Sequence, residues 1–283
     1  MKQFCWIGLL MWCLMGSQLL AQQTPVPIQA GPPVEQDSTA DSTSKRLEII
    51  HADLLSFDKR DGIGVQKLIG DVQLKQDSTL FFCERAYFYE AENRIEVFDS
   101  VRVEMPDSVF LFGDRMEYEG DTRVAEVYDN ITLTNQQSVL TTDRLTYYRE
   151  EEYGYYQDGG QLVDDESVLT SEFGYYYPNE DMAYFKKEVE LVHPDYTLHT
   201  DTLGYNTQTK VAVFLTLTDI ISKDGDIQTS SGTYDTRASR VNLTSRSTLK
   251  DSSYTLYSDS LDYIDEENIG IARGNVLVVQ ENT

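Results

Sequence analysis

Two stretches of this 283-residue chain, LHTDTLGY at residues 198–205 and LYSDSLDY at residues 256–263, follow one eight-residue pattern. The pattern places a small residue before an acidic residue, with an apolar residue at its start and an aromatic residue at its end. It occurs eight times between residues 50 and 263, and from Tyr118 onward the aromatic residue returns every 29 positions. A constant period of this length is typical of a repeat array, in which one structural unit stacks on the next.

The eight copies share two further features. Seven of the eight acidic positions hold a carboxylate, and the preceding position is always small, as at Cys83. Steric fit, not thiol reactivity, therefore explains Cys83. The apolar alternation shifts by one residue near the acidic position, which predicts a β-bulge or a corner there. We expect the carboxylate to accept backbone N–H bonds exposed by the bulge, in preference to binding a row of cations.

A second apolar pattern lies between the copies. Segments such as Val101-Arg102-Val103 and Ile131-Thr132-Leu133 alternate with period two, as strands with one buried face do. Turn-forming residues recur near positions 77, 107, 136, 165, 194, 224 and 252. No stretch has a convincing helical period. The sequence therefore predicts an all-β fold of about eight two-stranded antiparallel repeats, in one continuous array over residues 47–283.

The first 46 residues differ in composition from the repeats. Residues 1–21 begin with Lys2, continue with an apolar stretch and end at Ala21, which predicts a cleaved secretory signal peptide. Residues 22–46 are rich in Pro, Ser, Thr and acidic residues and predict a disordered linker. Cys5 and Cys13 would leave with the signal, so the exported chain would hold no intramolecular disulfide.

Charge and motif content exclude several classes of function. The formal net charge is -25, from 48 acidic and 23 basic residues, which argues against a nucleic-acid partner. An aromatic content of 11% supplies the apolar surface that a disordered chain lacks. The three histidines have no metal-ligand spacing, and the common catalytic and nucleotide-binding motifs are missing from the sequence. We expect no enzyme activity, no metal site and no cofactor.

The segment Gly70-Asp71-Val72-Gln73-Leu74, the copies at 198–205 and 256–263, and Gly274-Asn275-Val276 together resemble the OstA-like family. This is the periplasmic domain shared by the lipopolysaccharide-transport bridge protein LptA and the N-terminal part of the outer-membrane assembly protein LptD. The resemblance implies a twisted, semi-open β-jellyroll whose apolar interior binds lipid acyl chains. It also implies open edge strands at both ends, which join partners by sheet augmentation.

The resemblance and the period-two alternation together give a set of expected lipid contacts. We expect the aromatic ladder from Tyr118 to Tyr263 and the apolar residues of the intervening strands to face the interior. The expected lipid-lining residues are Val72, Leu74, Val101, Val103, Ile131, Leu133, Val189, Leu191, Val211, Val213, Val276 and Val278.

The function implied by the resemblance is non-catalytic transport of lipopolysaccharide toward the outer membrane, in the periplasm or associated with the outer membrane. Expected partners are the lipid A acyl chains, other OstA-like jellyroll domains or a second copy through the edge strands, and the outer-membrane assembly protein. Because the chain and lipopolysaccharide head groups are both acidic, recognition would rest on the acyl chains.

Two alternatives remain open from the sequence. The first is an exported β-solenoid scaffold for adhesion or polysaccharide contact, which differs from a carrier in having a packed core instead of a groove of lipid width. The second concerns the C-terminus, because the last strand pattern ends just before Thr283 with no polar capping repeat. Either this edge binds a partner or the array continues in a longer protein.

Overall fold

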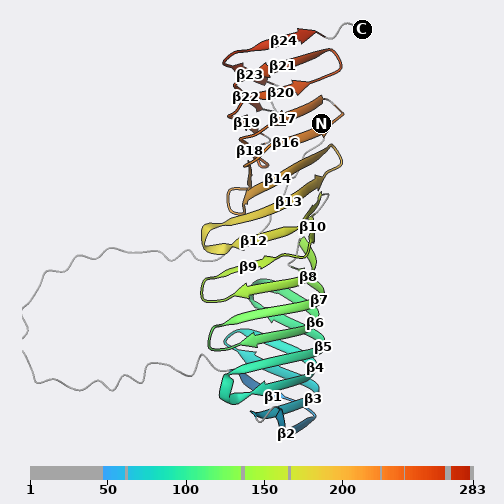
Figure 1. The fold of residues 1–283 in the computed structure, drawn as a ribbon, viewed down its shortest axis with the longest axis vertical. Helices are drawn as coiled ribbons and strands as arrows, with labels where there is room; N and C mark the ends of the chain where they lie inside the picture. Colours follow the sequence, from blue (N-terminus) through green and yellow to red (C-terminus); the bar gives the residue numbers. More distant parts are fainter. Residues whose placement is uncertain are drawn as a thin grey trace, which may run out of the picture.

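The described part of the computed structural model comprises residues 47–60, 63–134, 138–164, 167–223, 225–238, 240–264 and 269–280. These residues form a single antiparallel sheet of 24 strands, stacked along one long axis from blue at the N-terminal end to red at the C-terminal end (Figure 1). No α-helix occurs among the described residues, so the all-β prediction is confirmed. The predicted signal peptide at 1–21 and linker at 22–46 lie outside the described residues.

The strands run across the long axis, and each pairs with its neighbours in an antiparallel direction. They are β1 (Glu48–His51), β2 (Leu54–Arg60), β3 (Ile63–Gln76), β4 (Thr79–Tyr89), β5 (Arg94–Met105), β6 (Val109–Glu119), β7 (Val124–Thr134), β8 (Ser138–Tyr148), β9 (Tyr153–Tyr156), β10 (Gly160–Asp164), β11 (Ser167–Ser171), β12 (Phe173–Tyr177), β13 (Met182–Val192), β14 (Tyr196–Asn206), β15 (Val211–Phe214), β16 (Thr218–Ser222), β17 (Gly225–Thr229), β18 (Gly232–Asp235), β19 (Arg240–Leu243), β20 (Ser247–Lys250), β21 (Tyr254–Ser258), β22 (Ser260–Ile264), β23 (Ile269–Arg273) and β24 (Leu277–Gln280).

Most turns fall where the sequence predicts them. The expected turns near 77, 107, 194 and 252 separate β3 from β4, β5 from β6, β13 from β14, and β20 from β21. Short 3-10 helices occupy three of the turns in the described residues: η2 (Glu90–Glu92), η3 (Pro106–Ser108) and η4 (Pro178–Glu180). The turns expected near 136, 165 and 224 lie outside the described residues.

The sheet folds lengthwise into two facing layers. In β5, residues 101–105 and residues 94–98 pair with their neighbours in two blocks, and the register shifts between Phe98 and Val101. The block next to the turns near 77 and 107 continues through β10, β11, β16, β17, β20, β21 and β24, and we call it layer A. The other block continues through β9, β12, β15, β18, β19, β22 and β23, and we call it layer B.

The two layers meet at a corner, and we call the opposite side of the sandwich, next to the turns near 77 and 107, the mouth. The space between them holds the apolar core, where Phe81 of layer A lies with its ring centroid 6.5 Å from that of Tyr118 in layer B. Burying the apolar face of each layer against the other provides the main stabilisation of such a sandwich. This arrangement is the antiparallel β-jellyroll expected from the sequence.

The corner forms where the sequence places its acidic residues. Two consecutive residues on the facing strand have positive φ there, as at Asp129 (62°) and Asn130 (51°), and the register shifts beside Asp114. The bulge prediction is therefore correct. The expected donors are not, because the Asp114 carboxylate accepts a 2.7 Å bond from the Asn130 side chain, and Asp259 accepts one from Asn275. Side-chain amides thus donate at these two corners, whereas Glu172 accepts from Lys187 Nζ.

Glycine is required at the first corner for two reasons. Gly70 has φ +79°, and a Cβ added there would lie 2.4 Å from Asp53 Oδ2, whereas Gly159 has φ +85° with nothing within 4 Å of such a Cβ. Left-handed backbone costs an L-residue about 1–2 kcal/mol. We therefore expect Gly159→Ala to lower the free energy of unfolding by about that amount and Gly70→Ala by clearly more. Chemical denaturation of both variants measures the difference, and equal losses would contradict the steric role of Asp53.

The aromatic ladder faces the interior at most of its positions. Tyr118 is buried in the N-terminal cluster, and Tyr176, Tyr205 and Tyr234 pack against the C-terminal cluster. Tyr147 is the exception among these, with 37% of its surface exposed. In the part of the chain that the structure describes, no helix is long and apolar enough to cross a membrane.

Candidate functional site

The interior between the layers is the first candidate site. Six of the twelve predicted lining residues are fully buried there: Val72, Leu74, Val101, Val103, Ile131 and Val189. Leu133 and Leu191 are partly buried and pack against the same core. These eight residues lie on the predicted face, and their contact with lipid stays a prediction.

The last two predicted residues lie at the open C-terminal end. Val278 pairs with Leu256, which packs on the core, so Val276 and Val278 are on the interior side of the sheet. They are nevertheless 49% and 55% exposed, because β24 is the terminal strand of layer A and nothing in the described chain covers it. Their surroundings are those of an edge, not of a closed interior.

Val211 and Val213 lie on the wrong face for the predicted role. They alternate in β15 with Ala212 and Phe214, and the latter two belong to the buried cluster. Since successive side chains of a strand point to opposite faces, the two valines lie on the outer face of layer B. The expectation that they line the interior is therefore wrong.

The interior is closely packed along its length. Two clusters of buried apolar side chains fill it, one drawn from residues 68–131 and one from residues 169–261. Two cavities among the described residues lie at the corner and not between the layers. Their volumes are about 460 Å³ and 370 Å³.

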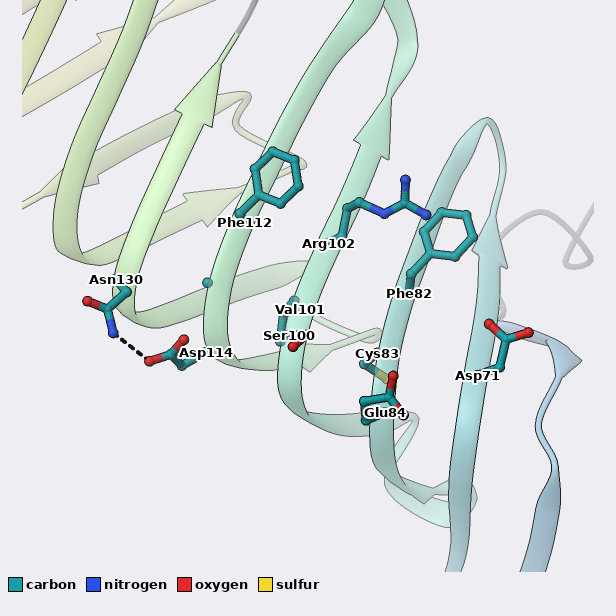
Figure 2. Close-up of a pocket in the computed structure, with 11 residues that line it drawn as sticks. Asp71, Phe82, Cys83, Glu84, Ser100, Val101, Arg102, Phe112, Asp114 and Asn130 are labelled. Atoms are coloured by element: carbon teal, nitrogen blue, oxygen red, sulfur yellow. Dashed lines mark hydrogen bonds between the residues drawn. The ribbon is translucent and has the colours of Figure 1, made fainter.

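The larger cavity lies beside the corner of the N-terminal repeats (Figure 2). Phe82, Arg102 and Phe112 form one side of it, and the corner carboxylates, among them Asp114, form the other. The Arg102 guanidinium lies 4.1 Å from the centroid of Phe82 and donates to Glu104 at 2.6 Å. These contacts satisfy Arg102 within the surface of layer A. No group of three His, Cys, Asp or Glu residues suited to a metal ion occurs in the described residues.

The smaller cavity has the same acidic character. Asp158, Glu172 and Glu188 line it together with Gly159 and Gly160. Both corner cavities thus combine carboxylates with small residues of the repeat. Neither holds a nucleophile paired with a base, so their chemistry is that of a charged surface.

Cys83 fits the steric interpretation of its position. The side chain is buried in the N-terminal cluster, and burial raises the pKa of its thiol to about 12. A thiol that stays protonated at neutral pH is a poor nucleophile and a poor metal ligand.

The two ends of the sheet form the second candidate site. At the N-terminal end β2 pairs only with β3 among the described strands, and its Phe57 is 77% exposed. At the C-terminal end β24 pairs only with β21 and β23 only with β22, and both expose apolar side chains. An edge with free backbone groups and apolar side chains is a template for pairing with another strand.

The mouth of the N-terminal half forms the third candidate site, and it is closed by polar contacts. Gln76, at the end of the layer A part of β3, is 1% exposed. Its Oε1 accepts a 2.8 Å bond from the hydroxyl of Tyr118 in layer B and another of 2.8 Å from Nη1 of Arg149, which follows β8. Arg149 Nη2 also binds Oδ2 of Asp77 at 2.5 Å. We call these four residues the mouth latch.

In the C-terminal half, Tyr196 of layer A and Tyr234 of layer B both pack against the apolar cluster. Burial raises the pKa of Tyr196 in layer A, and the neighbouring Tyr234 of layer B adds to the effect. Sequence reasoning predicted neither the mouth latch nor this placement of the two tyrosines. Neither follows from the repeat, because each joins residues of different units across the fold.

Two comparisons with known proteins found matches. A family model described as OstA-like protein matches residues 44–201 and 187–259. Among solved structures, LptH, the LptA homologous periplasmic component of the lipopolysaccharide transport device from Pseudomonas aeruginosa, matches with 12% sequence identity and a TM-score of 0.34. That match covers 38% of this chain and 84% of LptH. A search of curated proteins found no match.

Proposed function

The chain belongs to the OstA-like protein family, and on that premise we propose that it is a non-catalytic periplasmic carrier or bridge in lipopolysaccharide transport. The observation that carries the proposal is the combination of this family with two facing apolar layers whose end strands are not covered by any of the described residues. The predicted signal peptide supports export to the periplasm.

In this proposal the acyl chains of lipid A lie between the layers. Apolar side chains from both layers offer them a dry environment, and each buried methylene contributes about 0.8 kcal/mol. Side chains pack the interior, so acyl chains would enter by separating the layers at the mouth. The head group would stay outside, because sugars and phosphates lose hydration when buried.

The end strands would join the carrier to its neighbours. The exposed apolar edge at β24 and the one at β2 each offer a place where a strand of another β-jellyroll domain, or of a second copy, extends the sheet. Such a junction would continue the apolar interior from one domain into the next. Candidate neighbours are other OstA-like domains and the outer-membrane assembly protein.

One observation favours the alternative of an exported scaffold. The core residues of both clusters are buried, and the described cavities lie at the corner instead of between the layers. A scaffold for adhesion or polysaccharide contact requires a packed core of this kind. A carrier requires that the same core open for lipid.

Crosslinking separates the two functions. A photo-crosslinking residue at Val103, Leu133 or Leu191 should capture lipopolysaccharide, and one at the neighbouring Arg102, Thr132 or Glu190 should not. The reason is that adjacent side chains of a strand point to opposite faces of the layer, one toward the core and one toward water. The adduct is measured by gel shift and mass spectrometry on variants that retain the β-sheet circular dichroism of the wild type.

The paired positions serve as each other's controls. Equal labelling of both sets would mean that lipid contacts the surface without discrimination. No labelling at any interior position would favour the scaffold and contradict the carrier.

A further inference from the structure

We propose that the mouth latch is a head-group site, at which Arg149 exchanges the carboxylate of Asp77 for the phosphate of an anionic acylated lipid. The inference rests on the proposed carrier function and adds to it the place where the ligand is recognised. In this proposal the acyl chains enter beside Phe81 and Tyr118 while the phosphate stays at the rim on Arg149.

The first observation behind the proposal is the position of Arg149. Its guanidinium lies between the two layers, bonded to Gln76 and Asp77 of layer A, although the residue itself follows a strand of layer B. Immediately behind it are Tyr118, whose hydroxyl bonds the same Gln76 oxygen, and Phe81, whose ring packs on Tyr118. A cation at the rim with aromatic and aliphatic side chains behind it matches an amphiphile that has an anionic head and an apolar tail.

This ion pair differs from the others in what it joins. The remaining arginine pairs among the described residues lie within one layer or along the corner, as Arg102–Glu104, Arg144–Glu126 and Arg240–Asp262 do. Arg149–Asp77 connects residues 72 positions apart and spans the mouth. Breaking it therefore removes a contact between the layers, which breaking a pair inside one layer does not do.

The exchange is chemically balanced. A guanidinium presents parallel N–H donors that fit phosphate as well as carboxylate, so the cation stays paired before and after ligand binding. The side chains of Arg149 and Asp77 are 28% and 33% exposed, which leaves the pair within reach of a ligand in solvent. Asp77 is then released to water, where a carboxylate is well solvated.

The exchange also offsets the repulsion between the acidic chain and an anionic ligand. With a net charge of -25 the chain repels anionic ligands at long range. A cation held at the rim provides a local attraction where the acyl chains enter. Recognition then rests on Arg149 as well as on the apolar interior, in contrast to the sequence-based expectation that acyl chains alone would supply it.

The test compares two lipid probes on matched variants of the full mature chain. The probes are lipid A bearing its two phosphates and the same lipid after dephosphorylation, and binding is read by a photo-crosslinking residue at Val103. We expect the wild type to prefer the phosphorylated probe by about tenfold, the effect of one charge-assisted contact. Arg149→Ala should bind both probes equally. Arg144→Ala, which removes an outward arginine of the preceding strand β8, should keep the preference.

A second variant tests the exchange itself. Asp77→Asn removes the competing charge while keeping an acceptor for Arg149, so affinity for the phosphorylated probe should rise severalfold and affinity for the dephosphorylated probe should change less. Should Arg149→Ala lose its β-sheet circular dichroism, Arg149→Gln, which keeps a donor to Gln76, takes its place.

The outcomes separate this inference from the proposed function. If lipid labels Val103 but the phosphate preference persists without Arg149, the head-group site is wrong and the carrier stands. If neither probe labels Val103 in any folded variant, both are wrong. Loss of the preference in Arg149→Ala together with its retention in Arg144→Ala supports both.

Discussion

Replacing Tyr156 with alanine should lower the free energy of unfolding by about 3–5 kcal/mol, the range for a buried aromatic side chain. The ring fills a space that the surrounding backbone leaves open. A Cβ added at Gly174 would lie 2.2 Å from a ring carbon of Tyr156, and one added at Gly160 would lie 2.6 Å from the ring. Gly160 and Gly174 contribute no side chain that could close the cavity left by the substitution.

The position of Tyr156 in the sheet explains the size of this effect. Paired residues form a column along the interior side of layer B next to the corner, which runs from Leu68 to Ala272. Its members are Leu68, Ala86, Val97, Met116, Val127, Leu145, Tyr156, Gly174, Phe185, Leu203, Phe214, Gly232, Leu243, Leu261 and Ala272. Tyr156 alone in this column carries a polar group. It lies between the two apolar clusters, and its hydroxyl is 2.6 Å from Ser171 Oγ.

A further variant separates the contribution of the ring from that of its hydroxyl. Tyr156→Phe keeps the ring and should cost only about 1 kcal/mol, the value of one buried hydrogen bond.

Gly174→Ala should be strongly destabilising in the wild type and much less so together with Tyr156→Ala, because the added methyl group then enters the empty space. Urea denaturation of the wild type, Tyr156→Ala, Gly174→Ala and the double variant gives this double-mutant cycle. Additive losses in the free energy of unfolding would contradict the packing argument.

The sequence predicted the architecture because the repeat and the strand alternation are local signals. The 29-residue period placed every unit, and the parity break at the acidic residues located the corner. The outer placement of Val211 and Val213 shows the limit of such signals. All four residues of β15 are apolar, so alternation cannot choose a face, and the choice is made by Phe214 packing between its partners Leu203 and Gly232.

The mouth latch could not be predicted for a different reason. Gln76, Tyr118 and Arg149 belong to three different units, and they meet because the strands of the two layers cross at an offset along the long axis. This offset is a property of the assembled sandwich. The unit around Tyr156 presents Gly154 and Gly174 to the interior, where most other units present larger side chains.

Proline at an outward-donating position of β24 should strongly weaken association through the C-terminal edge. Successive residues of a strand direct their N–H groups to opposite sides of the strand. Of the variants Leu277→Pro and Val278→Pro, one therefore removes an N–H donor that points away from β21. The other removes a hydrogen bond to β21. The outward variant should weaken pairing with another chain by at least about tenfold, since a ladder bond is lost and the proline ring blocks close approach. Sedimentation velocity over a concentration series measures the effect, and association of both variants at the wild-type level would contradict edge pairing.

The two ends of the chain present different edge strands, and this difference predicts which variants stop the growth of an assembly. A contact between β24 of one copy and β2 of the next is head-to-tail, and such contacts produce open filaments unless the rotation closes a ring. A chain with proline in β24 keeps its β2 edge, so a small fraction of it mixed with wild type should cap filaments and shorten them. Phe57→Lys, which places a charge on the exposed β2 edge, should cap from the opposite end. If the contact instead joined two copies of β24, Phe57→Lys would leave association unchanged, so the two capping experiments identify which edges meet.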